Sequence, residues 1–522
     1  MKKMCKKAIS VFLVLALVFS VGATSVSAAE KTAENALKEL DKDIPIVEIH
    51  GFGDQPIYKG LSTETEEDDV DIWSFDGGEI AGLVIKNLPD LVYSMAFGKY
   101  DRIDVILNDV LGVIFGNVAC DENGVPDIDT GLKYYEPVAP KDEYGKENSY
   151  YFAYDWRLDM HTISSQLDDY INLVLEVTGA EEVGLVCFSL GGAVMMTYLY
   201  EHYYIASPEE RAKIHSAIFL SAAMNGVECC EDPFSGNIEF TSKSLLRLLS
   251  TLLPEDGSLV FVDDLLRIAY TLKLFDPIIN FTNESLVPNL DEMGGNAILN
   301  TIGSVPVFYA LMSTDRYYET EDYIFNTPEK KEKYATLIEK SRYYHDNVQA
   351  NADNIIEAFM ADGKNFAVLS EYGFEMLPVT SDNDRMADGM IGTYNTSFGA
   401  TCAEIDGTLG ENYVQAVQCE CGKNHISPDN QIDASTCKYA DITWFAKNLK
   451  HVDDDKYLAD LIDLVTYSDE QITVHTYSDL PQFLINVDDT CLVPMTADNF
   501  DAIVPFDGTT SIIRFLKKIF EK

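Results

Sequence analysis

Short apolar runs alternate with amphipathic stretches in the first half of the chain. The β-branched, apolar runs predict buried strands at residues 44–49, 150–154, 182–187 and 216–222. Between them, apolar side chains recur at helical spacing and predict helices at residues 162–177 and 191–200. Strands that alternate with helices in this way are typical of an α/β fold, with a mostly parallel central sheet and helices on both faces.

The alternation stops between about residues 226 and 345, where leucine-rich helices are predicted at 244–253 and 263–274. We expect this region to be a large helical insertion, which serves either as a lid or acyl-pocket wall or simply as packed core. The alternation then resumes, with strands predicted at 374–379 and 443–449 and helices at 457–465 and 511–520. An earlier stretch, residues 79–116, also has apolar helical patterning.

The first 29 residues have the pattern of a signal peptide. A basic start containing four lysines precedes an apolar run over residues 8–23, and small residues follow at 26–29. This predicts a secreted mature domain over residues 30–522, and the alternative is a retained N-terminal anchor. No later stretch is long and apolar enough for a transmembrane segment.

The chain is strongly acidic. Its formal net charge is −48, and removal of the four signal lysines would leave −48 − 4 = −52. Such a charge excludes nucleic acid as a main partner and disfavours anionic membrane surfaces. The hydrophobic share of 47% is that of a folded chain rather than a disordered acidic one.

Ten cysteines are present, one of them in the predicted signal peptide. The remaining nine leave at least one thiol unpaired within a monomer. Four lie in a cysteine-rich loop over about residues 395–440, namely Cys402, Cys419, Cys421 and Cys437. Outside the cell such a cluster favours one or two disulfides, and a zinc site completed by His425 is the alternative. We assign no cofactor and no metal ligand to the predicted catalytic site.

The strongest chemical signal is Cys187-Phe188-Ser189-Leu190-Gly191-Gly192, between a predicted strand and a predicted helix. A nucleophilic serine must stand clear of the sheet on a tight strand-to-helix turn, with small residues two positions before and after it. Gly191 meets this requirement, whereas Cys187 is larger than the usual glycine. Ser189 is therefore the predicted nucleophile, and the alternative is a plain serine in a helix-entry turn.

A second glycine-rich turn, His50-Gly51-Phe52-Gly53, follows the first predicted strand. A tetrahedral oxyanion needs two backbone N–H donors, one of which follows the nucleophile and one of which comes from an earlier loop. We expect Leu190 and Phe52 to supply them as the oxyanion hole. His50 precedes the nucleophile, and we expect it to be structural.

The general base should be a late histidine that follows a strand, and His451 fits best, with His425 and His475 as alternatives. The acid should follow the preceding strand. Asp388 begins an Asp-Gly turn and is the predicted acid, with Asp382 and Asp384 as close alternatives. The order Ser189, Asp388, His451 is that of α/β-hydrolases.

These motifs together resemble the lecithin:cholesterol acyltransferase family, including its bacterial lipase-like members. The resemblance spans about residues 44–480 and is carried by Tyr154-Asp155-Trp156-Arg157, Phe188-Ser189-Leu190-Gly191-Gly192, the Asp388 turn and Trp444-Phe445…Lys450-His451. It implies an α/β-hydrolase fold and cleavage or transfer of an acyl group of a lipid ester through an acyl-serine intermediate. We expect Asp155 and Arg157 to pin a strand end.

Three functional interpretations remain open. The first is a lipase, phospholipase or O-acyltransferase, because water and an alcohol attack the same acyl-enzyme. The second is a soluble carboxylesterase. The third belongs to another class: a secreted, non-catalytic binding protein on a decayed hydrolase fold, for which Cys187 is the one hint.

Overall fold

The computed structural model describes most of residues 31–500. Outside the description lie residues 1–30, 62–69, 73–85, 88, 91–92, 94–107, 110, 114, 134–147, 238, 252–259, 287–295, 377–379, 381–383, 406, 420, 450, 452–454, 488–491 and 501–522. The predicted signal peptide and the predicted helix at 511–520 fall entirely outside it. Most of the predicted helical stretch 79–116 and the residue Asp382 do so too.

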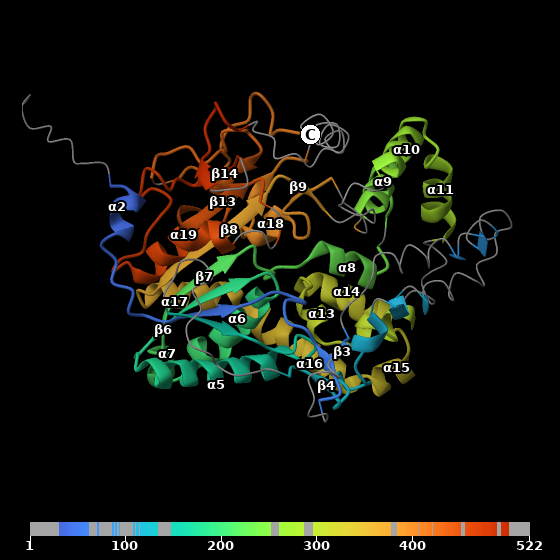
Figure 1. Ribbon diagram of the computed structural model, residues 1–522, viewed down its shortest axis with the longest axis horizontal. Helices are drawn as coiled ribbons and strands as arrows, with labels where there is room; N and C mark the ends of the chain where they lie inside the picture. Colours follow the sequence, from blue (N-terminus) through green and yellow to red (C-terminus); the bar gives the residue numbers. More distant parts are fainter. Residues whose placement is uncertain are drawn as a thin grey trace, which may run out of the picture.

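An eight-stranded sheet forms the centre of the molecule (Figure 1). Its strand order is β15-β14-β13-β8-β7-β6-β1-β5, and every neighbouring pair is parallel except β14 with the edge strand β15. The strands are β1 (Ile46–Ile49), β5 (Ser149–Phe152), β6 (Val183–Phe188), β7 (Ile214–Leu220), β8 (Asn365–Tyr372), β13 (Thr443–Lys447), β14 (Phe483–Asn486) and β15 (Leu492–Pro494). The predicted α/β class with a mostly parallel sheet is confirmed.

Helices cover both faces of this sheet (Figure 1). On one face lie α5 (Met160–Thr178), α6 (Gly191–Leu199) and α17 (Ala352–Ala361). On the other lies α19 (Asp455–Tyr467), against which α2 (Ala33–Leu37) packs. Parallel strands covered in this way must be apolar on both sides, and β6 and β7 are almost entirely buried.

Three small sheets and two short helices surround the centre. The first small sheet contains β2 (Tyr58–Lys59), β3 (Val70–Asp71) and β4 (Thr130–Gly131), the second contains β9 (Phe374–Glu375) and β10 (Met386–Ala387), and the third contains β11 (Thr401–Cys402) and β12 (Ile432–Asp433). The two helices are α7 (Pro208–Arg211) and α18 (Thr393–Thr396). The β9–β10 pair directly precedes the predicted acid Asp388, and the β11–β12 pair closes the base of the cysteine-rich loop.

The strand predicted at 374–379 is wrong in position. The central strand is β8 at Asn365–Tyr372, and among the described residues of the predicted segment Phe374–Glu375 form the short strand β9, whereas 377–379 lie outside the described residues. Polar residues interrupt the apolar pattern of β8, although all of its residues are buried. Asn365 donates hydrogen bonds to the carbonyls of Val465 and Ser468, so its polar side chain is compatible with burial.

The described residues of the region 226–345 are largely helical, as predicted, and they form two parts of different character. Their helices include α8 (Glu228–Phe234), α9 (Ser242–Thr251), α10 (Val260–Thr271), α11 (Asp276–Phe281), α13 (Val307–Ala310), α14 (Thr314–Ile324), α15 (Pro328–Lys333) and α16 (Ala335–Tyr343). The later helices belong to the core, where Phe308, Tyr309 and Tyr317 are buried. Helices α9–α11 instead stand apart from the sheet, at the upper right of Figure 1.

The outlying helices α10 and α11 expose apolar side chains. On or just after α10, Ile268 is 54% exposed and Leu272 is 63% exposed, and Leu265, Leu274 and, on α11, Ile278 are also exposed.

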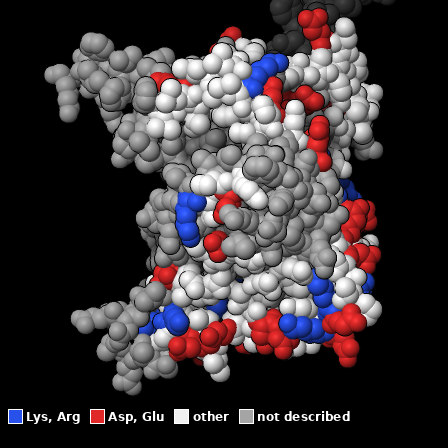
Figure 2. All heavy atoms as spheres, turned by 90° about the vertical axis from the view of Figure 1, so that its right-hand side faces the viewer, with Lys and Arg blue, Asp and Glu red and all other residues white. Residues whose placement is uncertain are grey.

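Charged side chains, most of them acidic, gather along the lower edge of the face seen in Figure 2. None of the described helices is both long enough and apolar enough to cross a membrane.

The described cysteines all carry free thiols, so the disulfides predicted for the cysteine-rich loop are absent from this part of the chain. Cys437 is buried, and Cys402 donates to the carbonyl of Ala400 at 3.4 Å. Cys419 and Cys421 turn toward His425 and Asp441 instead of pairing with other cysteines.

Candidate active site

Ser189 occupies a sharp turn between strand β6 and helix α6. Its φ of +50° lies in the left-handed region, which costs a non-glycine residue energy and is maintained only when the surroundings enforce it. The carbonyl of Ser189 accepts hydrogen bonds from the N–H groups of Gly192 at 2.9 Å and Ala223 at 2.7 Å. The turn is therefore held on both sides, and the Ser189 side chain stands at the carboxyl end of the sheet.

Glycine after the serine allows the helix to approach the sheet. A Cβ at Gly191 would overlap the carbonyl oxygen of Ile49 and lie 2.9 Å from that of His50. A Cβ at Gly192 would lie 2.7 Å from the Cβ of Ala222. Both glycines are thus required by close packing, which is the reason this turn type needs small residues.

His451 links Ser189 to Asp388. Its Nε2 lies 2.8 Å from Ser189 Oγ, and its Nδ1 lies 2.8 Å from Asp388 Oδ2. The backbone N–H of His451 also donates to the Asp388 carbonyl at 2.9 Å. The three predicted residues, from positions far apart in the chain, therefore form one continuous hydrogen-bonded line.

The Asp388 carboxylate is almost fully buried and well oriented. Its Oδ1 accepts from the backbone N–H groups of Met390 and Ile391, both at 2.8 Å, and this leaves Oδ2 for His451. An aspartate with these partners favours the tautomer in which His451 Nδ1 carries the proton and Nε2 accepts the serine proton. The Asp-Gly turn after β10 supplies this geometry, with Gly389 at a φ of +103°.

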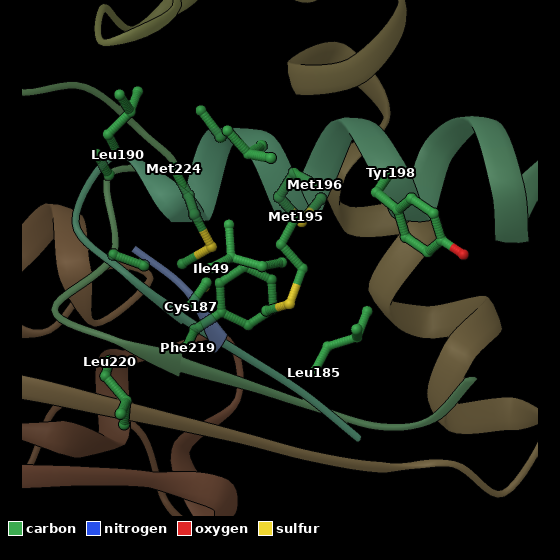
Figure 3. Packing of buried hydrophobic residues seen from close by; sticks show 14 of the residues in the cluster. Ile49, Leu185, Cys187, Leu190, Met195, Met196, Tyr198, Phe219, Leu220 and Met224 are labelled. Carbon is green, nitrogen blue, oxygen red and sulfur yellow. The ribbon is translucent and has the colours of Figure 1, made fainter. Parts of the chain in front are cut away.

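Cys187 packs in the core beneath α6. It is fully buried and lies near Ile49, Phe219 and Met224 between the sheet and the helix (Figure 3). Burial raises the pKa of its thiol well above the usual value, so the thiol stays protonated and unreactive. The larger residue is therefore accommodated by packing, without displacing Ser189 from its turn.

The glycine-rich turn after β1 lies directly against the nucleophile. A Cβ at Gly51 would sit 3.0 Å from the Cβ of Ser189. Phe52, next along this turn, packs its ring 4.4 Å from that of Trp156. Leu190 is the N-cap residue of α6, where backbone N–H groups lack partners within the helix. Leu190 therefore follows Ser189 directly, and Phe52 follows Gly51, which contacts Ser189.

His50 is buried between the rings of Tyr151 and Tyr154, at centroid distances of 5.0 and 4.3 Å. Burial lowers the pKa of His50 to about 4, so it is neutral near pH 7. Its Nδ1 lies 2.8 Å from the Gly51 carbonyl and, facing an acceptor, must carry the proton. These contacts orient the turn, which agrees with a structural role.

The Tyr154-Asp155-Trp156-Arg157 segment supports the same turn. The hydroxyl of Tyr154 donates to the His50 carbonyl at 2.9 Å. Arg157, which is fully buried, makes a two-pronged ion pair with Asp155 through bonds of 3.0 and 2.7 Å. This segment follows β5 and holds the His50 backbone through Tyr154, whereas the pinning of a strand end by Asp155 and Arg157 stays a prediction.

The alternative bases and acids lie elsewhere. His425 contacts Cys421 and Gln482, and His475 lies beside Asp441. Asp384 is half-exposed and pairs with Lys243 at 3.2 Å. Asp382 lies outside the described residues.

Two buried glutamates near the acid were not predicted. Glu371, near the end of β8, has its carboxylate within 4.8 Å of the ligand atoms of Asp388 and His451. Two carboxylates and an imidazole at this spacing could also bind a cation. Glu228 accepts from Gly392 N at 3.1 Å and from Asn395 Nδ2 at 3.0 Å, and this fixes the segment after Asp388. Burial raises the pKa of Glu228. Neither residue belongs to a local motif, so the sequence pattern offers no signal for them.

Comparisons with known proteins give no match from which an activity could be assigned, so the assignment depends on the geometry of Ser189, His451 and Asp388. No protein-family model matches the chain, and no curated protein matches its sequence.

Proposed function

We propose that this protein is a serine hydrolase of the α/β-hydrolase fold, in which Ser189 attacks an acyl ester and forms an acyl-enzyme. The hydrogen-bonded line from Ser189 through His451 to Asp388 is the observation that carries the proposal. The chain order of the three residues and the strained strand-to-helix turn at Ser189 also support it.

The proposed reaction uses the hydrogen bonds that join Ser189, His451 and Asp388. Ser189 Oγ would attack the ester carbonyl carbon while His451 Nε2 takes its proton, and the resulting oxyanion would accept from the N–H groups of Leu190 and Phe52. The imidazolium would then protonate the departing alcohol oxygen. Water, or an alcohol in acyl transfer, would then attack the acyl carbon and give its proton to His451, and His451 would pass that proton to Ser189 Oγ as the acyl–serine bond breaks.

We further propose a lipid ester as substrate, acted on after export of the protein. The exposed apolar side chains of α10 and α11 support this, because such a surface suits a water-insoluble ester or a lipid interface. The resemblance of the Tyr154–Arg157 and Ser189 segments to the lecithin:cholesterol acyltransferase family points the same way. In this proposal the outlying helices act as a lid or acyl-pocket wall.

A fluorophosphonate probe tests the proposal directly, because only an activated serine reacts with it. We expect the wild-type protein to be labelled at Ser189 and the Ser189→Ala variant to be unlabelled. The same variant should lose ester hydrolysis by several orders of magnitude while it keeps its circular dichroism spectrum. A folded wild-type protein that resists the probe would favour the non-catalytic binding protein.

A series of p-nitrophenyl esters from acetate to palmitate separates a lipase from a soluble carboxylesterase. A buried acyl chain gains about 0.8 kcal/mol per methylene, so an apolar wall should reward chain length. We expect rates to rise when the longer esters form aggregates. Rates that fall steadily with chain length would identify a soluble carboxylesterase.

A further inference from the structure

Four potential metal ligands converge in the cysteine-rich loop, remote in sequence from the Ser189 turn. The ligand atoms of Cys419, Cys421, His425 and Asp441 all lie within 4.8 Å of one another. Cys421 Sγ is 3.1 Å from His425 Nε2, and Cys419 Sγ is 3.6 Å from Asp441 Oδ1. The Cys-x-Cys-x₃-His spacing brings three of these ligands from seven consecutive positions, and Asp441 comes from the segment before β13.

The hydrogen bonds around Gln482 determine which nitrogen of His425 faces the cluster. The Gln482 amide nitrogen donates to the carbonyls of Ala440 at 2.8 Å and Thr443 at 3.1 Å, so its Oε1 must face His425. That oxygen lies 2.7 Å from His425 Nδ1 and can only accept. Nδ1 therefore carries the proton, and the lone pair of Nε2 points at Cys421 and its neighbours.

This arrangement is typical of a metal-binding histidine, whose second nitrogen usually donates to an oxygen acceptor that fixes the ring. A second histidine lies beside the carboxylate of Asp441. His475 Nε2 is a buried atom with no hydrogen-bond partner among the described residues, and it lies 3.7 Å from Asp441 Oδ1.

The distances fit a tetrahedral ion. Zinc–sulfur bonds of about 2.3 Å and zinc–nitrogen or zinc–oxygen bonds of about 2.0–2.2 Å imply ligand separations of roughly 3.3–3.8 Å. The separations in the structure are 3.1, 3.6 and 4.0 Å, the last between His425 Nε2 and Asp441 Oδ1, and they bracket that range. Two thiolates, one imidazole and one carboxylate form a donor set suited to zinc rather than to calcium or magnesium.

We propose that Cys419, Cys421, His425 and Asp441 form a structural zinc site. Two cysteines and a histidine come from the cysteine-rich loop, whereas Asp441 and the supporting Gln482 directly precede β13 and β14. The ion would thus fasten the loop to the amino-terminal ends of β13 and β14. All four coordination positions are occupied by protein, as in structural rather than catalytic zinc sites.

Metal content measured on the full-length protein tests the site without using catalysis. The reduced protein is exposed to zinc alone, freed of excess metal by gel filtration, and assayed by inductively coupled plasma mass spectrometry. We expect one zinc per wild-type chain, and with cobalt in its place a thiolate-to-cobalt charge-transfer band. Zinc affinity should fall about 100-fold or more in Cys421→Ser and in His425→Ala.

Cys402→Ser is the matched control, because it removes a thiol of the same loop that contacts the Ala400 carbonyl and not the cluster. It should keep its zinc and its cobalt band. Zinc should also raise the melting temperature of the wild type and of Cys402→Ser but not of Cys421→Ser. Three outcomes would overturn the site: no zinc on the wild type, zinc retained by both cluster variants, or a Cys419–Cys421 disulfide in the native protein.

Discussion

The two oxygens of the Asp388 carboxylate have different partners, and this division decides the state of His451. Oδ1 accepts hydrogen bonds from two backbone N–H groups, so Oδ2 alone accepts the hydrogen bond from His451 Nδ1–H. His451 Nε2 is then left as an acceptor for the Ser189 hydroxyl. At the scale of single residues, the proposed reaction depends on this one tautomer.

Asp388→Asn should lower kcat by about four orders of magnitude, because an amide can donate to the imidazole and so favour the wrong tautomer. Fluorophosphonate labelling and p-nitrophenyl butyrate hydrolysis measure the effect. Asp384→Asn is the matched control: the same chemical change at a half-exposed residue paired with Lys243 should leave both readouts nearly unchanged. Equal losses in the two variants would remove Asp388 from its proposed role.

His345 gives a prediction about stability. It is fully buried, stacks 4.1 Å from Tyr317, and has its pKa lowered by burial to about 4. In the unfolded chain its pKa returns to about 6.5, so between about pH 6.5 and 4 the unfolded state binds more protons. Stability therefore falls as the pH falls through this window, by roughly 3 kcal/mol for this residue at most.

Urea unfolding of wild type and His345→Gln at about pH 7.5 and about pH 4.5 tests this linkage. The variant should be the less stable protein at the higher pH, because it loses the stacking on Tyr317. The difference in unfolding free energy should shrink at the lower pH, because glutamine does not titrate. A difference that is independent of pH would show that His345 is not the titrating group.

At the scale of elements, the turn between β6 and α6 depends on the end of β1. The first turn of α6 lies against the carbonyls of Ile49 and His50, and these in turn belong to the segment that leads to Phe52. The nucleophile and the proposed oxyanion loop are thus positioned by one contact between a helix and a strand. A group added between Gly191 and the Ile49 carbonyl would therefore displace both the Ser189 turn and the loop that carries Phe52.

Gly191→Ala should therefore reduce both stability and activity. The added methyl would overlap the Ile49 carbonyl, and overpacking of this kind costs about 1–3 kcal/mol. Urea unfolding and turnover of a soluble ester measure the two effects. In Gly116→Ala the added Cβ meets nothing within 4 Å, so this control should retain both properties. A fully active, stable Gly191→Ala protein would contradict the close approach.

For the whole molecule, the distribution of apolar surface is uneven. Helices α13, α14 and α16 bury their apolar side chains in the core, whereas α10 exposes Leu265 and Ile268, with Leu272 just beyond its end. The three residues follow helical spacing and therefore share one side. Meanwhile the chain carries a net charge of −48, which opposes approach to anionic surfaces. Neutral or zwitterionic lipid is the interface that suits both properties.

A triple variant, Leu265→Gln, Ile268→Gln and Leu272→Gln, should turn over micellar long-chain esters about tenfold more slowly, which corresponds to about 1.4 kcal/mol of lost binding. Turnover of a soluble acetate ester should stay the same. The control, Val177→Gln with Ile205→Gln, replaces exposed apolar residues elsewhere and should keep both activities. An equal loss on both substrates would indicate that α10 does not contact lipid.

Local sequence determined the elements whose stability depends on a simple pattern. Strands β1, β6 and β7 are mostly apolar, and α5 and α6 follow at helical spacing, so their places were predicted to within a few residues. The Ser189 turn was predictable for the same reason, because its small residues are adjacent in sequence. Strand β8 was misplaced because its polar residues are satisfied only by distant partners such as Val465 and Ser468.

The choice among histidines and aspartates was made only by the tertiary structure. Ser189 and His451 are 262 positions apart, and the hydrogen bond between them exists because parallel strands deliver their carboxyl ends to one edge of the sheet. From the sequence, His425 was an alternative base and its cysteines were expected in disulfides. Folding instead places His425 between Gln482 and Cys421, and that position is decided by hydrogen bonds between segments that no local pattern connects.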